Sequence, residues 1–142
     1  MWSSGQSNCR SSGLALVPFL YDLALVQEVG GRYKEAAATL QKAASLCTRI
    51  PVGKTTFPDR AEILLQLGVV LAKMNNQDRA ETILNEVVAL EQKATGPAST
   101  YTMTATHELA NLYRKTGKAE RAEQLDDYIR SQEQAARKLL RD

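Results

Sequence analysis

The sequence predicts an all-α protein in which three antiparallel helix pairs stack into a short right-handed superhelix, an α-solenoid. The first observation is a Leu-Ala or Leu-Gly pair that opens three copies of one longer pattern. The second is an alanine twelve residues after the small member of each pair, and the third is a Gly or Asn seven residues after it. A helix-turn-helix unit of this kind buries its apolar face only against neighbouring units. Stacked repeats therefore form an extended surface that holds other molecules.

Small residues stand at matching positions on both helices of each predicted pair. The pairs on the first helices are Leu23-Ala24, Leu67-Gly68 and Leu109-Ala110. The later alanines and the turn residues are Ala36, Ala80 and Ala122, with Gly31, Asn75 and Gly117. Because bulk at the crossing would splay a pair, we expect the two helix backbones of each unit to approach closely at these small residues.

The first unit is expected at about residues 17–50. Its first helix is expected to begin near Pro18, because proline is tolerated in the first turn, and to end at Gly30-Gly31, with the partner helix starting near Tyr33. The Ser- and Gly-rich residues 1–13 are expected to form a disordered tail ahead of a repeat domain at 14–142. Because Pro18 and Asp22 interrupt the apolar run, a secretory signal peptide is not favoured, whereas an organelle address stays open.

The second and third units are expected at about residues 58–95 and 99–140. Pro58 opens the second unit after a long loop at 48–57, and the stretch at Gly96-Pro97 ends it. Ser99 or Thr100 can cap the third unit by accepting a hydrogen bond from a helix amide. The last helix, from about residue 118 to 140, is unusually long, and its extended end is expected to act as a cap.

Composition excludes several classes of function. The chain has 142 residues, of which 44% are hydrophobic and 24% charged, as in an ordinary soluble domain. Its net charge of +2 is not gathered into a basic block, so we expect no nucleic-acid partner. The two cysteines, Cys9 and Cys47, favour a reducing compartment, the cytoplasm, with an organelle lumen or matrix as the alternative. The longest apolar stretch is too short to cross a bilayer.

Motifs that could carry chemistry are weak. Gly53-Lys54-Thr55 resembles the end of a phosphate-binding loop, but Thr48 stands where that loop needs a glycine. His107 lies beside Glu108 without a nucleophile within one helical turn, so a surface histidine that contacts ligands is expected. Cys47 is expected to pack rather than react. We therefore predict no enzyme activity and no cofactor.

A cation site near the start of the last helix is also disfavoured. Asp126 and Asp127 stand close to Glu123 in the sequence. Carboxylates on a helix that lacks a ligand-bearing loop usually form a solvated face. We therefore predict no metal site.

At the repeated positions the chain resembles the tetratricopeptide repeat family. The small residues of successive copies, at 24, 68 and 110, lie 44 and 42 residues apart, which is longer than the usual period of about 34. This length is similar to that of the kinesin-light-chain subgroup, as is the stretch from Gly96 to Glu123. Three positions depart from the family pattern, at Gln27, Thr106 and Asp126. The two outer repeats therefore look degenerate.

The resemblance implies a noncatalytic scaffold or adaptor that binds a peptide or helix on the inner, concave face formed by the first helix of each unit. The residues that correspond to this face are Tyr21, Leu25, Glu28, Leu65, Val69, Lys73, His107, Asn111, Arg114 and Lys115. The alternative is a structural subunit embedded in a larger assembly. An apolar stripe on the last helix either folds back as a cap or docks a partner or a second copy. The residues of that stripe are Leu125, Ile129, Leu139 and Leu140.

Overall fold

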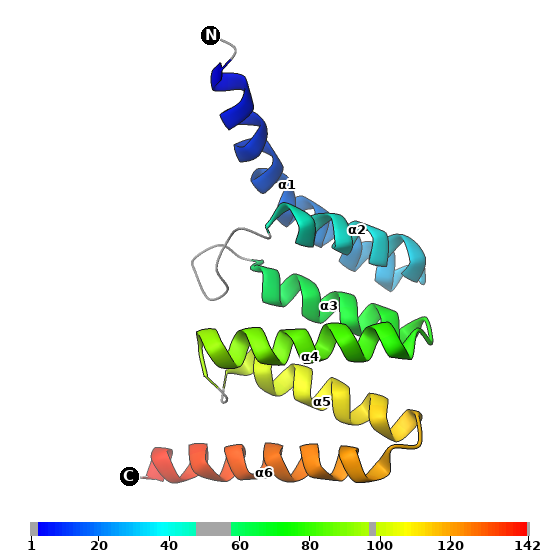
Figure 1. Ribbon diagram of the computed structural model, residues 1–142, viewed down its shortest axis with the longest axis vertical. Helices are drawn as coiled ribbons and strands as arrows, with labels where there is room; N and C mark the ends of the chain where they lie inside the picture. Colours follow the sequence, from blue (N-terminus) through cyan, green and yellow to red (C-terminus); the bar gives the residue numbers. More distant parts are fainter. Residues whose placement is uncertain (1–2, 48–57, 97–98, 142) are drawn as a thin grey trace.

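The described part of the chain is a stack of six α-helices without a strand. The computed structural model describes residues 3–47, 58–96 and 99–141. Figure 1 shows the helices following one another along the long axis in chain order. They are α1 (Ser3–Val29), α2 (Tyr33–Leu46), α3 (Arg60–Lys73), α4 (Gln77–Ala94), α5 (Thr100–Lys115) and α6 (Ala119–Arg141).

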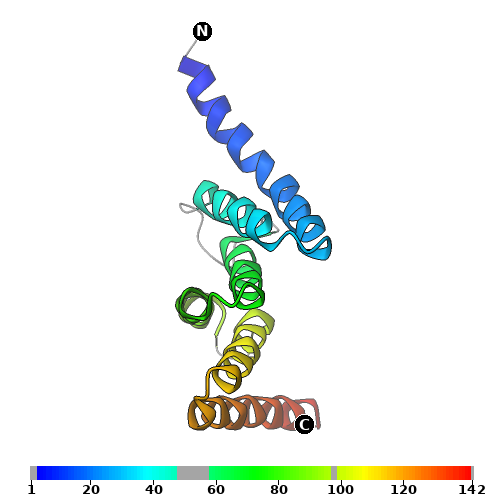
Figure 2. The same ribbon diagram turned by 90° about the vertical axis from the view of Figure 1, so that its right-hand side faces the viewer.

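The helices pack with their neighbours in sequence. The pairs α1–α2, α3–α4 and α5–α6 form three helix-turn-helix units, and α2–α3 and α4–α5 join successive units. The first helices α3 and α5 also contact each other. The predicted three-unit helical solenoid is therefore confirmed (Figures 1 and 2).

The turn inside each unit has the same backbone geometry. Gly31, Asn75 and Gly117 have φ angles of 77°, 61° and 80°, in the left-handed region. In each turn the next residue donates its N–H to the carbonyl five residues earlier, as Asn76 does to Leu71 at 2.9 Å. This pattern satisfies carbonyls that the end of a helix leaves without partners. The repeated Gly or Asn therefore marks the position where the backbone must turn left-handed.

Side-chain caps fix where the second and third units begin. Asp59 Oδ1 accepts a hydrogen bond from the Glu62 N–H at 2.9 Å, so α3 begins at Arg60, two residues after the expected start at Pro58. Ser99 Oγ accepts from the Thr102 N–H at 3.1 Å, which identifies Ser99 as the cap of α5. Each cap satisfies an amide that the first helical turn leaves without a partner.

The predicted beginning of the first helix is wrong. Helix α1 begins at Ser3, so residues 3–13, expected as a disordered tail, are helical, and Pro18 lies inside the helix. Proline has a helical φ, but inside a helix it removes the hydrogen bond to the carbonyl four residues earlier and its ring crowds that carbonyl. Pro18 is exposed, which lets water reach this part of the helix. The expected loop at 48–57, with Gly53-Lys54-Thr55, lies outside the described residues.

The crossing of the paired helices depends on the small residues. Ala24, Ala36, Ala80, Ala110 and Ala122 are all at most 2% exposed. At Gly68 there is no room even for a methyl group, because a Cβ would lie 2.7 Å from Leu84 Cδ2 and 2.8 Å from Leu84 Cγ. A small residue is therefore required at Gly68, but the group that contacts it is the Leu84 side chain rather than the backbone near Ala80, where the close approach was expected.

We predict that Ala80→Leu destabilises the middle unit. Ala80 is fully buried where α4 crosses α3, so three added heavy atoms have no space, and we expect a loss of about 1–3 kcal/mol in the free energy of unfolding. The measurement is urea unfolding followed by circular dichroism. The matched control is Ala89→Leu, an exposed position on the same helix. Equal stability of the two variants would contradict the packing described here.

We predict that Asn75 tolerates glycine but not a β-branched residue. Its positive φ is accessible to Gly without steric cost, whereas an ordinary side chain loses about 1–2 kcal/mol there. Thermal melts are therefore expected to show Asn75→Gly at least as stable as the native chain and Asn75→Val clearly less stable. Similar melting temperatures for both variants would show that the turn does not need its left-handed residue.

Candidate functional site

The residues predicted to form the inner, binding face lie at very different depths. The direct contact between α3 and α5 brings the first helices of successive units together, as on the concave side of a superhelix. Five of the predicted residues are exposed on α3 and α5: Lys73, His107, Asn111, Arg114 and Lys115. Three are half-buried: Leu25, Glu28 and Val69. We refer to these eight residues as the inner face.

Two predicted binding residues lie in the core instead. Tyr21 and Leu65 are each 6% exposed and belong to the main hydrophobic cluster. Neither side chain presents a surface to a ligand, and we therefore leave both out of the inner face. Their repeat position is buried in the first two units and exposed only in the third, at His107.

A buried tyrosine joins the first unit to the second. The Tyr21 hydroxyl donates a hydrogen bond to Glu62 Oε1 on α3. Burial and the neighbouring Glu62 carboxylate raise the pKa of the Tyr21 phenol, so it stays protonated and remains a donor. Burial and Glu62 also raise the pKa of Tyr101 on α5. Glu62 therefore joins α1 to α3 and acts electrostatically on Tyr101 of α5, a role that sequence analysis did not find.

A second polar link lies on the inner face. The Lys73 ammonium contacts Glu28 Oε1 at 2.6 Å, and Gln66 donates a hydrogen bond to the other carboxylate oxygen of Glu28. The hydrogen bond to Glu28 raises the pKa of Lys73, and Lys73 Nζ also lies 6.0 Å from the centre of the Tyr33 ring. Both carboxylate oxygens of Glu28 are therefore used in contacts that hold α1 against α3.

The third unit presents the most accessible part of the inner face. The Arg114 guanidinium pairs with Asp126 Oδ2 on α6 at 2.6 Å and donates to Asn111 Oδ1 at 2.8 Å. These contacts hold both inner-face side chains in place and leave the Asn111 amide NH₂ as the group that it can offer to a ligand. Asp126, a departure from the repeat pattern in the sequence, thus has a structural role as the partner of Arg114.

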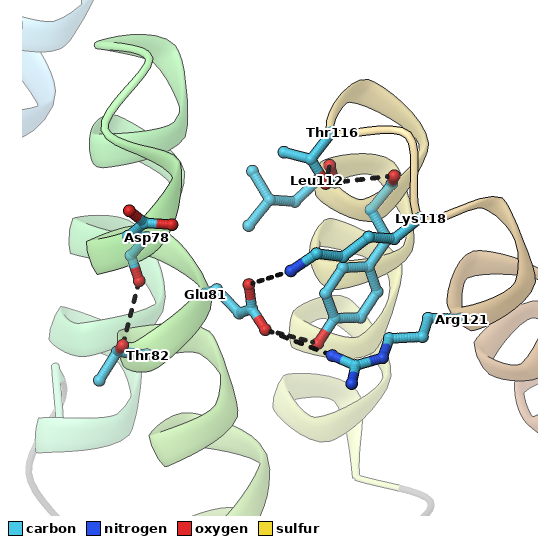
Figure 3. A network of polar contacts seen from close by, with 8 residues as sticks. Asp78, Glu81, Thr82, Leu112, Thr116, Lys118 and Arg121 are labelled. Atoms are coloured by element: carbon cyan, nitrogen blue, oxygen red, sulfur yellow. Dashed lines mark hydrogen bonds and ion pairs between the residues drawn. The ribbon is translucent and has the colours of Figure 1, made fainter.

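On the other side of α5, one acidic residue contacts two cationic side chains of the third unit. Glu81 on α4 accepts a hydrogen bond from the Tyr113 hydroxyl at 3.2 Å and lies 3.4 Å from the Lys118 ammonium. Arg121 is 3.9 Å from the same carboxylate, and Figure 3 shows both cations pointing toward Glu81. A cavity of about 500 Å³ beside them is lined by residues 117–121. This cluster holds α5 and α6 against α4.

Of the side chains considered for chemistry, Cys47 is buried and His107 is exposed. Cys47 is 3% exposed, its thiol donates to the Ala43 carbonyl at 3.3 Å, and burial raises its pKa. Such a thiol packs rather than reacts, as predicted. His107 is an exposed residue on α5. Within the described ranges no group of three or more His, Cys, Asp or Glu is placed to hold a metal ion.

The predicted C-terminal stripe divides into two parts. Ile129 is 3% exposed and Leu125 packs partly against the core, so this half of α6 covers the third unit. Leu139 and Leu140 are 78% and 87% exposed, on the end of α6 that extends past α4 and α5 in Figure 1. Among the described residues, no helix is long and apolar enough to cross a membrane.

Comparisons with known proteins agree with this architecture. A sequence model described as tetratricopeptide repeat matches residues 18–93 and, in a second register, residues 59–127. Together these matches run from the first unit to residue 127, within α6 of the third unit. No curated protein matches the sequence.

Two similar solved structures contain nearly identical TPR-like repeats of a kinesin light chain from Podosopora anserina. One, a variant, has a TM-score of 0.74 at 19% identity over 87% of this chain. The other has a TM-score of 0.71 at 20% identity over 86% of this chain. In both cases the match spans 57% of the other chain, somewhat more than half of its length. At this level of identity the likeness establishes the fold.

We predict that Glu81→Ala loosens the junction between the second and third units. Removing the carboxylate leaves Lys118 and Arg121 facing each other across Tyr113, and we expect a loss of about 1 kcal/mol, the upper end for partly exposed ion pairs. Urea unfolding in low salt and in 1 M NaCl measures the effect, which salt should reduce. The matched control is Glu123→Ala, at the equivalent, exposed position of the third unit. A salt-independent loss would contradict this electrostatic origin.

Proposed function

The chain belongs to the tetratricopeptide repeat family, and on that basis we propose that it is a noncatalytic scaffold that binds a protein partner as a peptide or helix on its inner face. Repeats of this family generally mediate contacts between proteins. The proposal rests on one observation: the third unit presents exposed, polar side chains, held by contacts to their neighbours, on the side where the first helices meet.

The hydrogen-bonding groups of α5 are suited to binding the backbone of an extended or helical peptide ligand. His107 and Asn111 are one helical turn apart on the same exposed face of α5, so both can reach one ligand segment. Asn111 is held by Arg114, which lowers the entropic cost of using it. An amide and an imidazole bind peptide carbonyl and amide groups without requiring one particular ligand side chain.

The character of the inner face changes from one end of the stack to the other. Toward α1 it contains the half-buried apolar side chains Leu25 and Val69. Val29, which is not one of its eight residues, adds an apolar side chain on α1 that is 90% exposed. On α5 it is polar and basic, with Lys115 at the repeat position that Val29 occupies in the first unit. A ligand that combines an apolar segment with an acidic segment would complement both ends.

Two further aspects belong to the same proposal. The buried thiol of Cys47 suits a reducing compartment, and we place the protein in the cytoplasm. A second candidate function is a structural subunit that sits permanently inside a larger assembly. The exposed apolar side chains Phe19, Val26, Leu139 and Leu140 favour this candidate, because such groups are usually covered in an assembly.

We predict that the double substitution His107→Ala with Asn111→Ala weakens peptide capture at least tenfold. Both side chains are exposed, so the helix content should remain unchanged by circular dichroism. The measurement is binding to an array of peptides derived from proteins that co-purify with the native chain. The native chain and the variant are compared on the same array.

The matched control is Asn85→Ala with Lys93→Ala, two exposed positions on the second helix α4. This control should bind as the native chain does. Equal peptide capture by the native chain, the variant and the control would show that the inner face is not the binding site. A single stoichiometric complex, with no exchangeable partner, would instead favour the structural subunit.

A further inference from the structure

Apolar side chains of α1 lie exposed on a side that no described helix covers. Leu16, Phe19 and Val26 are 49%, 63% and 62% exposed. Their spacing of three and seven residues places them along one side of the helix. We call the side defined by these three residues the α1 side. Exposed apolar groups that gather on one side of a helix indicate a contact with another element.

In the other two units the corresponding side of the first helix is buried. The residues at the positions of Phe19 and Val26 are Ile63 and Val70 in the second unit, and Ala105 and Leu112 in the third. All four are at most 2% exposed, and their helices α3 and α5 pack against the second helix of the preceding unit, α2 and α4. The α1 side is therefore the side on which the second helix of another unit packs.

Among the described helices, α6 is the second helix that has this contact still to make. Helices α2 and α4 already carry a first helix, α3 and α5, on the corresponding side. Helix α4 uses Glu81 there, which accepts a hydrogen bond from the Tyr113 hydroxyl at 3.2 Å and lies 3.4 Å from the Lys118 ammonium. The residues of α6 that are identical to those 42 positions earlier on α4 are Arg121, Ala122, Glu123, Glu133, Gln134 and Ala136. Helix α6 therefore presents an exposed acidic residue, Glu123, at the position of Glu81.

The first unit carries polar groups that fit this acidic residue. The positions of Tyr113 and Lys118 are occupied in the first unit by Gln27 and Arg32. Gln27 Oε1 accepts a hydrogen bond from the Thr39 hydroxyl at 2.8 Å, so the amide NH₂ is the group that Gln27 can offer to a neighbour. A hydrogen-bond donor and an exposed cation thus stand at the positions from which the third unit contacts α4.

Two departures from the α4–α5 junction make such a contact weaker. Arg130 occupies the position of Val88, which packs partly against the core. Glu35 occupies the position of Arg121 and pairs with Arg32 at 3.5 Å. The apolar stem of an arginine can still cover apolar surface while its charge stays in water. We therefore expect reversible association rather than a permanent complex.

We propose that α6 of one copy of the chain packs on the α1 side of the next copy, so that copies stack head to tail and continue the superhelix. Glu123 of one copy would then meet Gln27 and Arg32 of the next. Such a contact is heterologous, so it leaves a free α1 side at one end and a free α6 at the other, and further copies can add. The inference is independent of the proposed peptide binding, because it uses other sides of both helices.

The first test is the mass of the full chain by sedimentation equilibrium between about 1 and 200 µM, the range of weak protein contacts. We expect the mass to rise from the 15.6 kDa of one chain past that of two chains. Val26→Asp places a carboxylate where Glu123 docks and should raise the dissociation constant at least tenfold. Val26 is 62% exposed, so the helix content by circular dichroism should not change.

The matched control is Val29→Asp, which adds the same charge to α1. Its equivalents Lys73 and Lys115 are exposed although a second helix packs on α3 and on α5, so this position lies outside the contact. The Val29→Asp chain should assemble as the native chain does.

The second test exchanges the charges of the proposed ion pair. Arg32→Glu and Glu123→Arg each bring like charges together and should raise the dissociation constant about fivefold. A chain with both substitutions should assemble nearly as the native chain does. Because the two residues lie in the first and third units of one chain, such a rescue reports a contact between copies. The control is Gln124→Arg, at the position of Thr82, which Figure 3 shows pointing away from Lys118 and Arg121.

Three results would overturn the proposal. The first is a native chain that stays at the mass of one chain at about 200 µM. The second is a mass that stops at two chains, which indicates a closed dimer. The third is a chain with both charge substitutions that assembles no better than the chains with one.

Discussion

The whole stack depends on how closely two helices can cross inside one unit. At Gly68 the Leu84 side chain occupies the space where a Cβ would be, and the alanines at the other crossings are almost completely buried. The crossing therefore fixes how α4 lies against α3 within the middle unit. On its other side α4 meets the third unit, where Glu81 contacts Tyr113 and Glu91 contacts Ser99.

Much of the fold could be predicted because backbone-restricting residues stand at the turns. Gly31, Asn75 and Gly117 take the left-handed conformation that the sequence pattern requires, and Ser99 caps α5 as predicted. The beginning of α1 could not be predicted in the same way. Proline is compatible with the first turn of a helix and with an exposed interior position, so Pro18 alone does not distinguish a helix start from a helix that continues through it.

The candidate site was harder to predict, because side-chain depth and pairing depend on tertiary contacts. Tyr21 and His107 share one repeat position, yet the first is buried beside Glu62 and the second is exposed. The Tyr21–Glu62 and Glu28–Lys73 contacts join residues 41 and 45 positions apart, and no local pattern marks them. The repeat does show which positions are equivalent in the three units. It relates the exposed Phe19 and Val26 on α1 to buried residues on α3 and α5.

The neighbour-to-neighbour packing of the six helices also bears on how the chain folds and opens. Nearly all helix contacts join elements adjacent in the sequence, so forming them closes only short loops, which favours rapid folding. The middle unit has neighbours on both sides, whereas the outer units each have one. Opening should therefore proceed inward from the ends, and amide hydrogens of α3 and α4 should be the last to exchange with solvent.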